Sequence, residues 1–201
     1  MPIAAKRLST LSTFGDLTVV SGGQTGVDRQ ALDWALARGV CTAGFLPADG
    51  LAEDGPVDPR YGLRCLPHAG YRERTRANVE LAQATLILSS DAVLSGGSLL
   101  TLEHARRVGR PTLHLHPGLN WQALFRAQSQ VLGAHVLNVA GPRASGGALA
   151  EEFCTAVLDA WLAHHTDAES TLSHPLMQAD VIDALVASIV RFDALYEALA
   201  Q

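Results

Sequence analysis

Short apolar runs alternate with amphipathic stretches from residue 17 to residue 162. The runs lack polar alternation, as is typical of strands buried on both faces of a parallel sheet. They lie at 17–21, 41–46, 85–89, 111–115 and 135–139, with a weaker one at 63–66. Apolar positions at helical spacing predict helices at 27–38, 71–83, 99–108, 120–132 and 148–165. The pattern predicts an α/β protein with a mostly parallel sheet of about five to six strands, wrapped by helices.

Two segments depart from this alternation. Residues 47–62 are rich in Gly, Pro and Asp and predict a long irregular loop, of a kind that is usually functional or mobile. After a polar break, residues 175–200 carry a strongly apolar helical pattern. We therefore divide the chain into a Rossmann-like ligand-binding domain, 1–165, and a C-terminal helical extension, 166–201, that serves packing or oligomerisation.

Composition narrows the partners and the compartment. Hydrophobic residues make up 48% of the chain and charged residues 17%, which is typical of a compact globular protein. The net charge of −5 gives no general attraction to nucleic acid or acidic membranes, so we expect neither as a partner. No secretory signal or membrane-spanning run is evident, and the three cysteines are too far apart for a C-x-x-C pair. We expect a cytoplasmic protein whose anionic ligands are held by local groups.

The first candidate site is the turn SGGQTGVDR at 21–29, between a predicted strand and a predicted helix. Its glycines permit a tight turn, and the N–H groups and dipole of the next helix attract an anion. In the alternative interpretation, Thr25 caps the helix and Asp28 complements the helix dipole. No Lys-Ser/Thr pair follows the glycines, which argues against NTP hydrolysis. The candidate ligand-binding residues of this turn are Ser21, Gly22, Gly23, Gln24, Thr25, Gly26 and Arg29.

Two further strand-to-helix turns repeat this device, at SGGSLLT (95–101) and at LNVAGPR (137–143). In a doubly wound sheet all three turns lie at the carboxyl edge, where ligands bind. They therefore predict one composite anion pocket. At the third turn, next to Gly141, Arg143 is the candidate clamp on a phosphate; a solvated loop arginine is the alternative. Glu103 is a weak catalytic candidate, set against a surface glutamate that complements the helix dipole.

Three smaller patterns accompany the turns. The segment YRERTRANVE (71–80) places three arginines near a helix N-terminus, which indicates either a nearby anion or a solvated basic face. His114 and His116 share one side of a strand, but no third metal ligand is evident from their spacing. Glu53 and Asp54 in the long loop are candidates to bind a cation or to close over a ligand. We predict no metal site.

Six segments together resemble the molybdenum carrier protein family, within the superfamily of the Lonely Guy (lysine-decarboxylase-like) nucleotide phosphoribohydrolases. The resemblance implies a Rossmann-like, three-layer α/β/α fold. It also implies a homo-oligomer, a dimer or tetramer, that binds molybdenum cofactor, a pyranopterin with a phosphate and a dithiolene-held molybdate. The six segments span most of residues 17–145 in order: SGGQTGVDR at 21–29, AEDGPV at 52–57, YRERTRANV at 71–79, TLI at 85–87, SGGSLLT at 95–101 and LNVAGPR at 137–143.

This resemblance also assigns site residues. It implies that the 21–29 turn forms part of the anion and pterin site. The rest of the site would be lined by Thr75, Asn78, Gly96, Gly97, Ser98, Thr101, Asn138 and Arg143.

The expected function is the binding and carrying of molybdenum cofactor or molybdate for a molybdoenzyme client. We expect no catalysis, because no nucleophile–base pair is evident. The alternatives are a phosphoribohydrolase that cleaves nucleoside monophosphates and a nucleotide-sensing module. The Lonely Guy hydrolases carry Gly-Gly-x-Gly-Thr-x-x-Glu; here the paired glycines and Glu103 keep that spacing, and Leu99 and Leu100 replace Gly-Thr.

Overall fold

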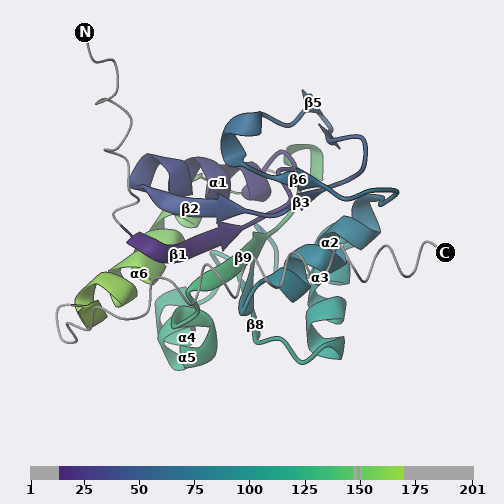
Figure 1. Cartoon of the computed structure of the whole chain (residues 1–201). Helices are drawn as coiled ribbons and strands as arrows, with labels where there is room; N and C mark the ends of the chain where they lie inside the picture. The colour runs from purple at the N-terminus through teal and green to yellow at the C-terminus, as the bar shows by residue number, and fades with distance from the viewer. Residues whose placement is uncertain (1–13, 147–148, 150, 170–201) are drawn as a thin grey trace, which may run out of the picture.

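A computed structural model describes residues 14–146, 149 and 151–169 of the chain. Its centre is a five-stranded sheet in the order β2-β1-β9-β7-β8, and every neighbouring pair is parallel (Figure 1). This confirms the predicted Rossmann-like α/β fold. The strands are β1 (Phe14–Val20), β2 (Val40–Ala43), β7 (Ala84–Leu88), β8 (Thr112–Leu115) and β9 (Val136–Ala140).

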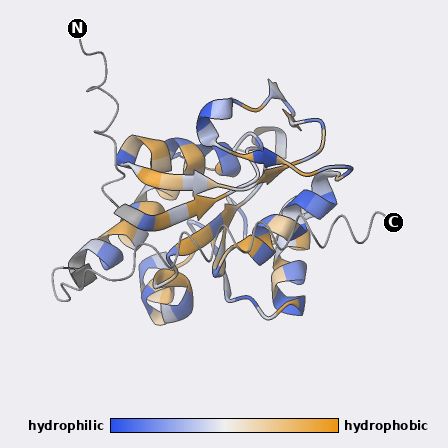
Figure 2. Cartoon of the chain, viewed as in Figure 1, coloured by the Kyte–Doolittle hydropathy of each residue, from blue (hydrophilic) through white to orange (hydrophobic). Residues whose placement is uncertain are grey.

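Helices cover both faces of this sheet. One face packs its apolar side chains in a large buried cluster with α1, α4, α5 and α6. On the other side α2 and α3 pack against each other and against β9, β7 and β8. Figure 2 shows the hydrophobic residues gathered on the strands between these layers. The helices are α1 (Val27–Arg38), α2 (Tyr71–Leu81), α3 (Gly96–Arg107), α4 (Trp121–Ala127), α5 (Ser129–Leu132) and α6 (Glu151–Glu169).

Two tryptophans join α1 to α6 in the core. The rings of Trp34 and Trp161 lie with centroids 6.2 Å apart, and both side chains are buried. The indole N–H of Trp34 donates to Asp159, and that of Trp161 donates to the carbonyl of Ala134. Neither indole N–H is therefore left unpaired in the core. This packing fixes α1, whose N-terminus follows the first candidate turn.

Some predicted elements divide. The predicted strand at 41–46 is two strands, because the chain turns at Gly44, whose φ of 142° disfavours any side chain. Its second part, β3 (Phe45–Leu46), pairs with β6 (Arg64–Cys65), so the weak run at 63–66 belongs to a separate two-stranded sheet. The predicted helix at 120–132 is likewise broken at Gln128 into α4 and α5.

The predicted irregular loop at 47–62 contains local structure. It carries a hairpin of β4 (Leu51–Ala52) and β5 (Gly55–Pro56), and a 3-10 turn, η1 (Pro59–Tyr61). A small apolar cluster beneath it includes Val57, Tyr61 and Leu32 of α1. The loop therefore packs firmly against α1.

At the C-terminal side, α6 continues past the predicted domain limit at 165, to Glu169. The predicted helical extension at 175–200 lies outside the described residues. Among the described residues, no helix has both the length and the apolar character to span a membrane.

Candidate functional site

A cavity of about 380 Å³ lies at the carboxyl edge of the sheet. Its wall combines the β7–α3 connection, the turn after β9, and the first turns of α2. The lining is mostly polar and includes two arginines. The lining residues are Gln24, Asp28, Arg74, Thr75, Ser89, Ser90, Asp91, Val93, Leu94, Ser95, Gly96, Gly97, Ser98, Thr101, Ala140, Gly141, Pro142, Arg143, Ser145 and Gly146.

The N-terminus of α3 forms one side of the cavity. The helix begins at Gly96, three residues earlier than its apolar pattern predicts, so both glycines belong to its first turn. Ser95 stands at the cap position, but its side chain makes no capping hydrogen bond. The first N–H groups of a helix have no intrahelical partner, and their partial positive charge attracts an anion. A Cβ at Gly97 would meet nothing within 4 Å, so this glycine leaves open space.

A buried ion pair forms the wall opposite this turn. Arg74 Nη1 lies 3.3 Å from Asp28 Oδ2, and the two side chains are 11% and 7% exposed. Burial raises the pKa of Asp28 above its ordinary value of 3.8, while the Arg74 charge and N–H donors of Gln24 and Gly22 act in the opposite direction. The guanidinium lies directly over Gly22, where a Cβ would come within 1.6 Å of Arg74 Nη1. A side chain at position 22 would therefore displace this guanidinium.

Two buried donors in the cavity wall lack a partner. Gln24 Nε2 and Arg74 Nε are both shielded from solvent and make no hydrogen bond. Gln24 is only 6% exposed, and its Oε1 already accepts from the N–H groups of Thr25 and Glu53. An unpaired buried donor costs about 1–3 kcal/mol. Both residues line the cavity.

Arg143 supplies an exposed positive charge to the cavity lining, which also includes the exposed Asp91. Its guanidinium stands over the ring of Tyr71, with Cζ 5.8 Å from the ring centroid. That distance is within the range of a cation–π contact, which orients the arginine without neutralising it. Arg143 of the third predicted turn thus adds a positive charge to the cavity that the second turn also lines.

The first turn is organised differently, since several of its donors, though not Gln24 Nε2, already have acceptors in the protein. The N–H of Val27 donates to the carbonyl of Pro142, and that of Thr25 donates to the Gln24 side chain. The Thr25 hydroxyl donates to Glu53 from the long loop, and Ser145 donates to the other Glu53 oxygen at 2.7 Å. These bonds lower the pKa of Glu53 below its ordinary value of 4.5. A carboxylate of the protein itself therefore occupies this turn.

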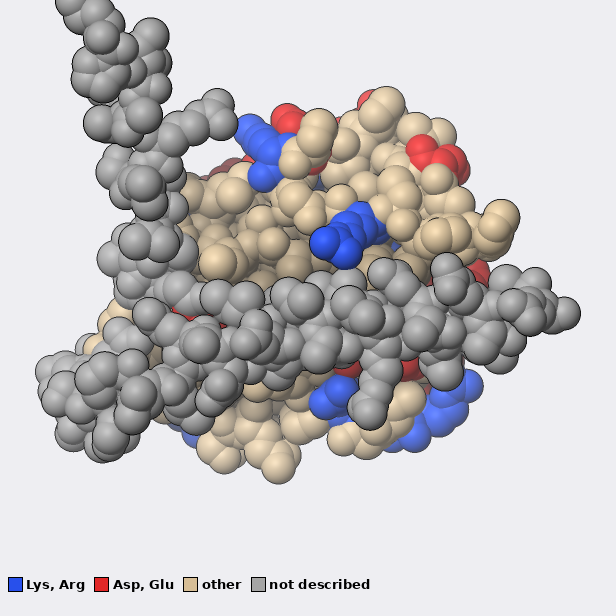
Figure 3. All heavy atoms as spheres, viewed as in Figure 1, with Lys and Arg blue, Asp and Glu red and all other residues tan. Residues whose placement is uncertain are grey.

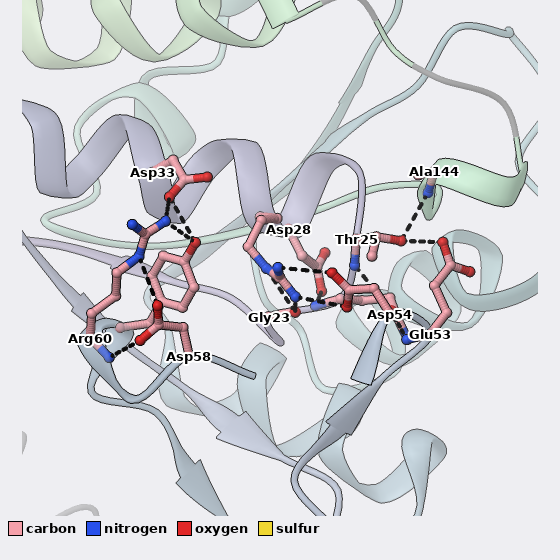
Figure 4. Close-up of polar contacts among 12 residues, drawn as sticks. Gly23, Thr25, Asp28, Asp33, Glu53, Asp54, Asp58, Arg60 and Ala144 are labelled. Carbon is pink, nitrogen blue, oxygen red and sulfur yellow. Dashed lines mark hydrogen bonds and ion pairs between the residues drawn. The ribbon is translucent and has the colours of Figure 1, made fainter. Parts of the chain in front are cut away.

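Further contacts fasten the same loop to α1 (Figure 4). Arg29 Nη1 lies 3.2 Å from Asp54, and the arginine also donates to the carbonyl of Gly23. Arg60 lies 2.5 Å from Asp33, which also accepts from the Tyr61 hydroxyl at 2.7 Å. The predicted charge of Arg29 is thus neutralised within the loop.

The relatives of the chain agree with this fold. A model described as the circularly permutated YpsA SLOG family matches residues 19–162. The chain belongs to this family. It is also similar to the crystal structure of a "Putative molybdenum carrier protein" from Syntrophus aciditrophicus SB, with a TM-score of 0.66 and 35% sequence identity. That match covers 73% of this chain and 94% of the other. No curated protein matches the chain.

The resemblance to molybdenum carrier proteins is therefore confirmed at the level of the family. In this YpsA SLOG chain, half of the sixteen residues predicted to bind ligand line the cavity. They are Gln24, Thr75, Gly96, Gly97, Ser98, Thr101, Gly141 and Arg143.

The other eight lie outside the cavity lining, where most make contacts within the protein. Asn78 binds both backbone groups of Phe45 and so holds β3. Asn138 donates to Thr85 Oγ1 within the sheet, and Ser21 donates to the carbonyl of Val139. The remaining residues of this set are Gly22, Gly23, Thr25, Gly26 and Arg29.

Arg74 and Asp28 line the cavity, and neither is among the predicted site residues. Arg74 lies in the arginine-rich segment that indicates a nearby anion, and Asp28 is the residue that complements the dipole of α1 in the alternative interpretation. An arginine and an aspartate 46 positions apart give no local pattern, so only the packing of α2 on the first turn joins them.

Three smaller predictions have a definite place. Glu103 is exposed and lies outside the cavity, in a hollow between α2 and α3. His114 Nε2 lies 2.6 Å from Ser89 Oγ, and the Ser89 hydroxyl donates to the carbonyl of Asp91. With its proton placed there, Ser89 is not activated as a nucleophile. Across the described part of the chain, no three His, Cys, Asp or Glu side chains are arranged to hold a metal ion.

Proposed function

We propose that the cavity binds molybdenum cofactor or molybdate and carries it to a client molybdoenzyme. The observation that supports this most is the pair of unpartnered buried donors, Gln24 Nε2 and Arg74 Nε, in a cavity that faces the open N-terminus of α3. Neither donor has an acceptor among the described residues, and an oxyanion or a pterin carbonyl would supply one. The name of the solved relative refers to molybdenum, which favours this cargo among anions.

The charges suit a ligand with two anionic ends. Arg143 and the α3 N-terminus would hold one end, and Arg74 with Gln24 the other. A cavity of about 380 Å³ lies in the range of small-molecule sites, which run from roughly 300 to 1,000 Å³. The lining offers hydroxyls for the polar atoms between these ends, from Thr75, Ser98 and other serines.

A carrier role without covalent chemistry fits the same lining. Glu103, the carboxylate that a phosphoribohydrolase would need beside the ribose, lies in the α2–α3 hollow and outside the cavity. We therefore expect no release of free base from nucleoside monophosphates.

The test is retention of intact cofactor. Purified protein is incubated with molybdenum cofactor, separated from free cofactor, and assayed by reconstitution of an apo-molybdoenzyme. The expected result is transfer of active cofactor, and its loss in Arg143→Gln. The control Arg126→Gln removes an exposed arginine of α4 outside the cavity and leaves transfer unchanged. Equal transfer with and without the protein would contradict the proposal.

A further inference from the structure

A second hollow, of about 300 Å³, lies on the side of α2 and α3 away from the ligand cavity. We call it the arginine hollow. Thr75 of α2 and Ser98 of α3 line the ligand cavity, whereas other residues of these two helices line this hollow. The arginine hollow is lined by Arg72, Arg76, Leu100, Glu103, His104 and Arg107.

Its three arginines have no acidic partner. None of Arg72, Arg76 and Arg107 makes an ion pair with a described residue, although the whole chain has a net charge of −5. Arg72 and Arg76 lie one helical turn apart, a spacing at which like charges destabilise a helix. The Nε of Arg76 is shielded from solvent and has no acceptor. Figure 3 shows basic side chains gathered over the C-terminal part of α3.

A buried histidine orients one of these arginines. Arg107 Nη2 lies 2.5 Å from His104 Nδ1, and His104 Nε2 lies 2.6 Å from Glu80 Oε1. Because an arginine only donates, Nδ1 is the acceptor, so Nε2 carries the proton and donates to Glu80. His104 is only 4% exposed, so this relay is part of the packed α2–α3 contact. A solvated surface arginine needs no such support.

We propose that the arginine hollow is a docking site for an acidic segment of a partner protein. The charges come from two helices and line one hollow with Leu100, which suits an extended segment whose carboxylates pair with the arginines separately. Glu103 adds a negative charge to the same hollow and so disfavours a compact dianion such as inorganic phosphate. We identify this partner as the enzyme that receives the cargo, and only that identification rests on the proposed carrier function.

The test uses a fluorescein-labelled hexaglutamate peptide as the probe, with fluorescence anisotropy on the full chain. We expect saturable binding that weakens with salt, as for any exposed ion pairs. The double variant Arg76→Gln/Arg107→Gln should bind about fivefold to tenfold more weakly, the effect of two exposed charge pairs. Restoring charge in Arg76→Lys/Arg107→Lys should recover most of the loss. The control Arg126→Gln should bind like the unmodified chain.

Two results would overturn the proposal. One is equal peptide affinity in the chain and in the double variant, with unchanged circular dichroism. The other is that inorganic tripolyphosphate binds the hollow and the peptide does not, which would indicate a small-anion site. Arg143→Gln separates this inference from the carrier function, because it should lose cargo and keep peptide binding.

Discussion

The turn at residues 21–26 and the turn at residues 95–98 both bring paired glycines and a helix N-terminus to the same edge of the sheet. At the first turn, the N–H groups and hydroxyls already bind acceptors of the protein, among them the Glu53 carboxylate. At the second, the cap position makes no side-chain bond and the glycines face a cavity. An anion site is therefore recognised by the donors that remain free after folding.

The glycines themselves differ in the same way. Gly22 makes room for a side chain of the protein, since a Cβ there would overlap the Arg74 guanidinium. A Cβ at Gly97 would meet no atom within 4 Å, so this glycine faces open space. We infer that the first turn is mainly a structural joint between α1, α2 and the long loop, to which Gln24 adds one ligand donor, and that the second turn is the main part that holds ligand.

The largest expected effect comes from breaking this joint with Arg74→Gln. The change leaves Asp28 buried without a cation, which costs about 3 kcal/mol of unfolding free energy. Urea denaturation at pH 7 measures it. The control Arg29→Gln breaks the exposed pair with Asp54 in the same turn and should cost less than about 1 kcal/mol. Adding Asp28→Asn to Arg74→Gln should recover part of the loss; an equal cost for the two arginines would contradict a buried structural role.

A smaller effect separates the two glycines directly. Gly22→Ala should displace Arg74 and lower the unfolding free energy by about 1–3 kcal/mol, the range for overpacking. Gly97→Ala should leave stability within about 0.5 kcal/mol, because the new methyl meets open space. Its effect should instead appear as weaker retention of molybdenum cofactor. The reverse assignment, a stable Gly22→Ala and an unstable Gly97→Ala, would remove the distinction between the turns.

The smallest effect concerns the carboxylate in the first turn. Hydrogen bonds hold the pKa of Glu53 below 4.5 in the folded state, so its contribution to stability is present above pH 4.5 and is lost as the pH falls through the lowered value. Urea denaturation from pH 7 to pH 3 should show a difference between the chain and Glu53→Gln at pH 7. That difference should shrink below pH 4.5. A difference that does not change with pH would show that the carboxylate charge plays no part.

The sequence predicts the strands and helices of this fold better than it predicts which residues contact one another. Every strand of the main sheet coincides with a predicted apolar run to within a few residues, because burial on both faces leaves a continuous apolar signature. Asn78 and Asn138 show the limit. Both lie in segments that resemble a ligand site, yet each binds within the protein. Which face of a helix or strand meets a cavity depends on packing between distant segments, as with Asp28 and Arg74.

The most direct measurement is the position of molybdenum in crystals of the chain loaded with molybdenum cofactor, read from anomalous scattering at the molybdenum edge. We expect a peak inside the cavity, between the N-terminus of α3 and the two arginines Arg74 and Arg143. We also expect Glu53 to keep its bonds to Thr25 and Ser145. A peak beside Thr25 and Arg29, with Glu53 displaced, would contradict this expectation and give the ligand to the first turn.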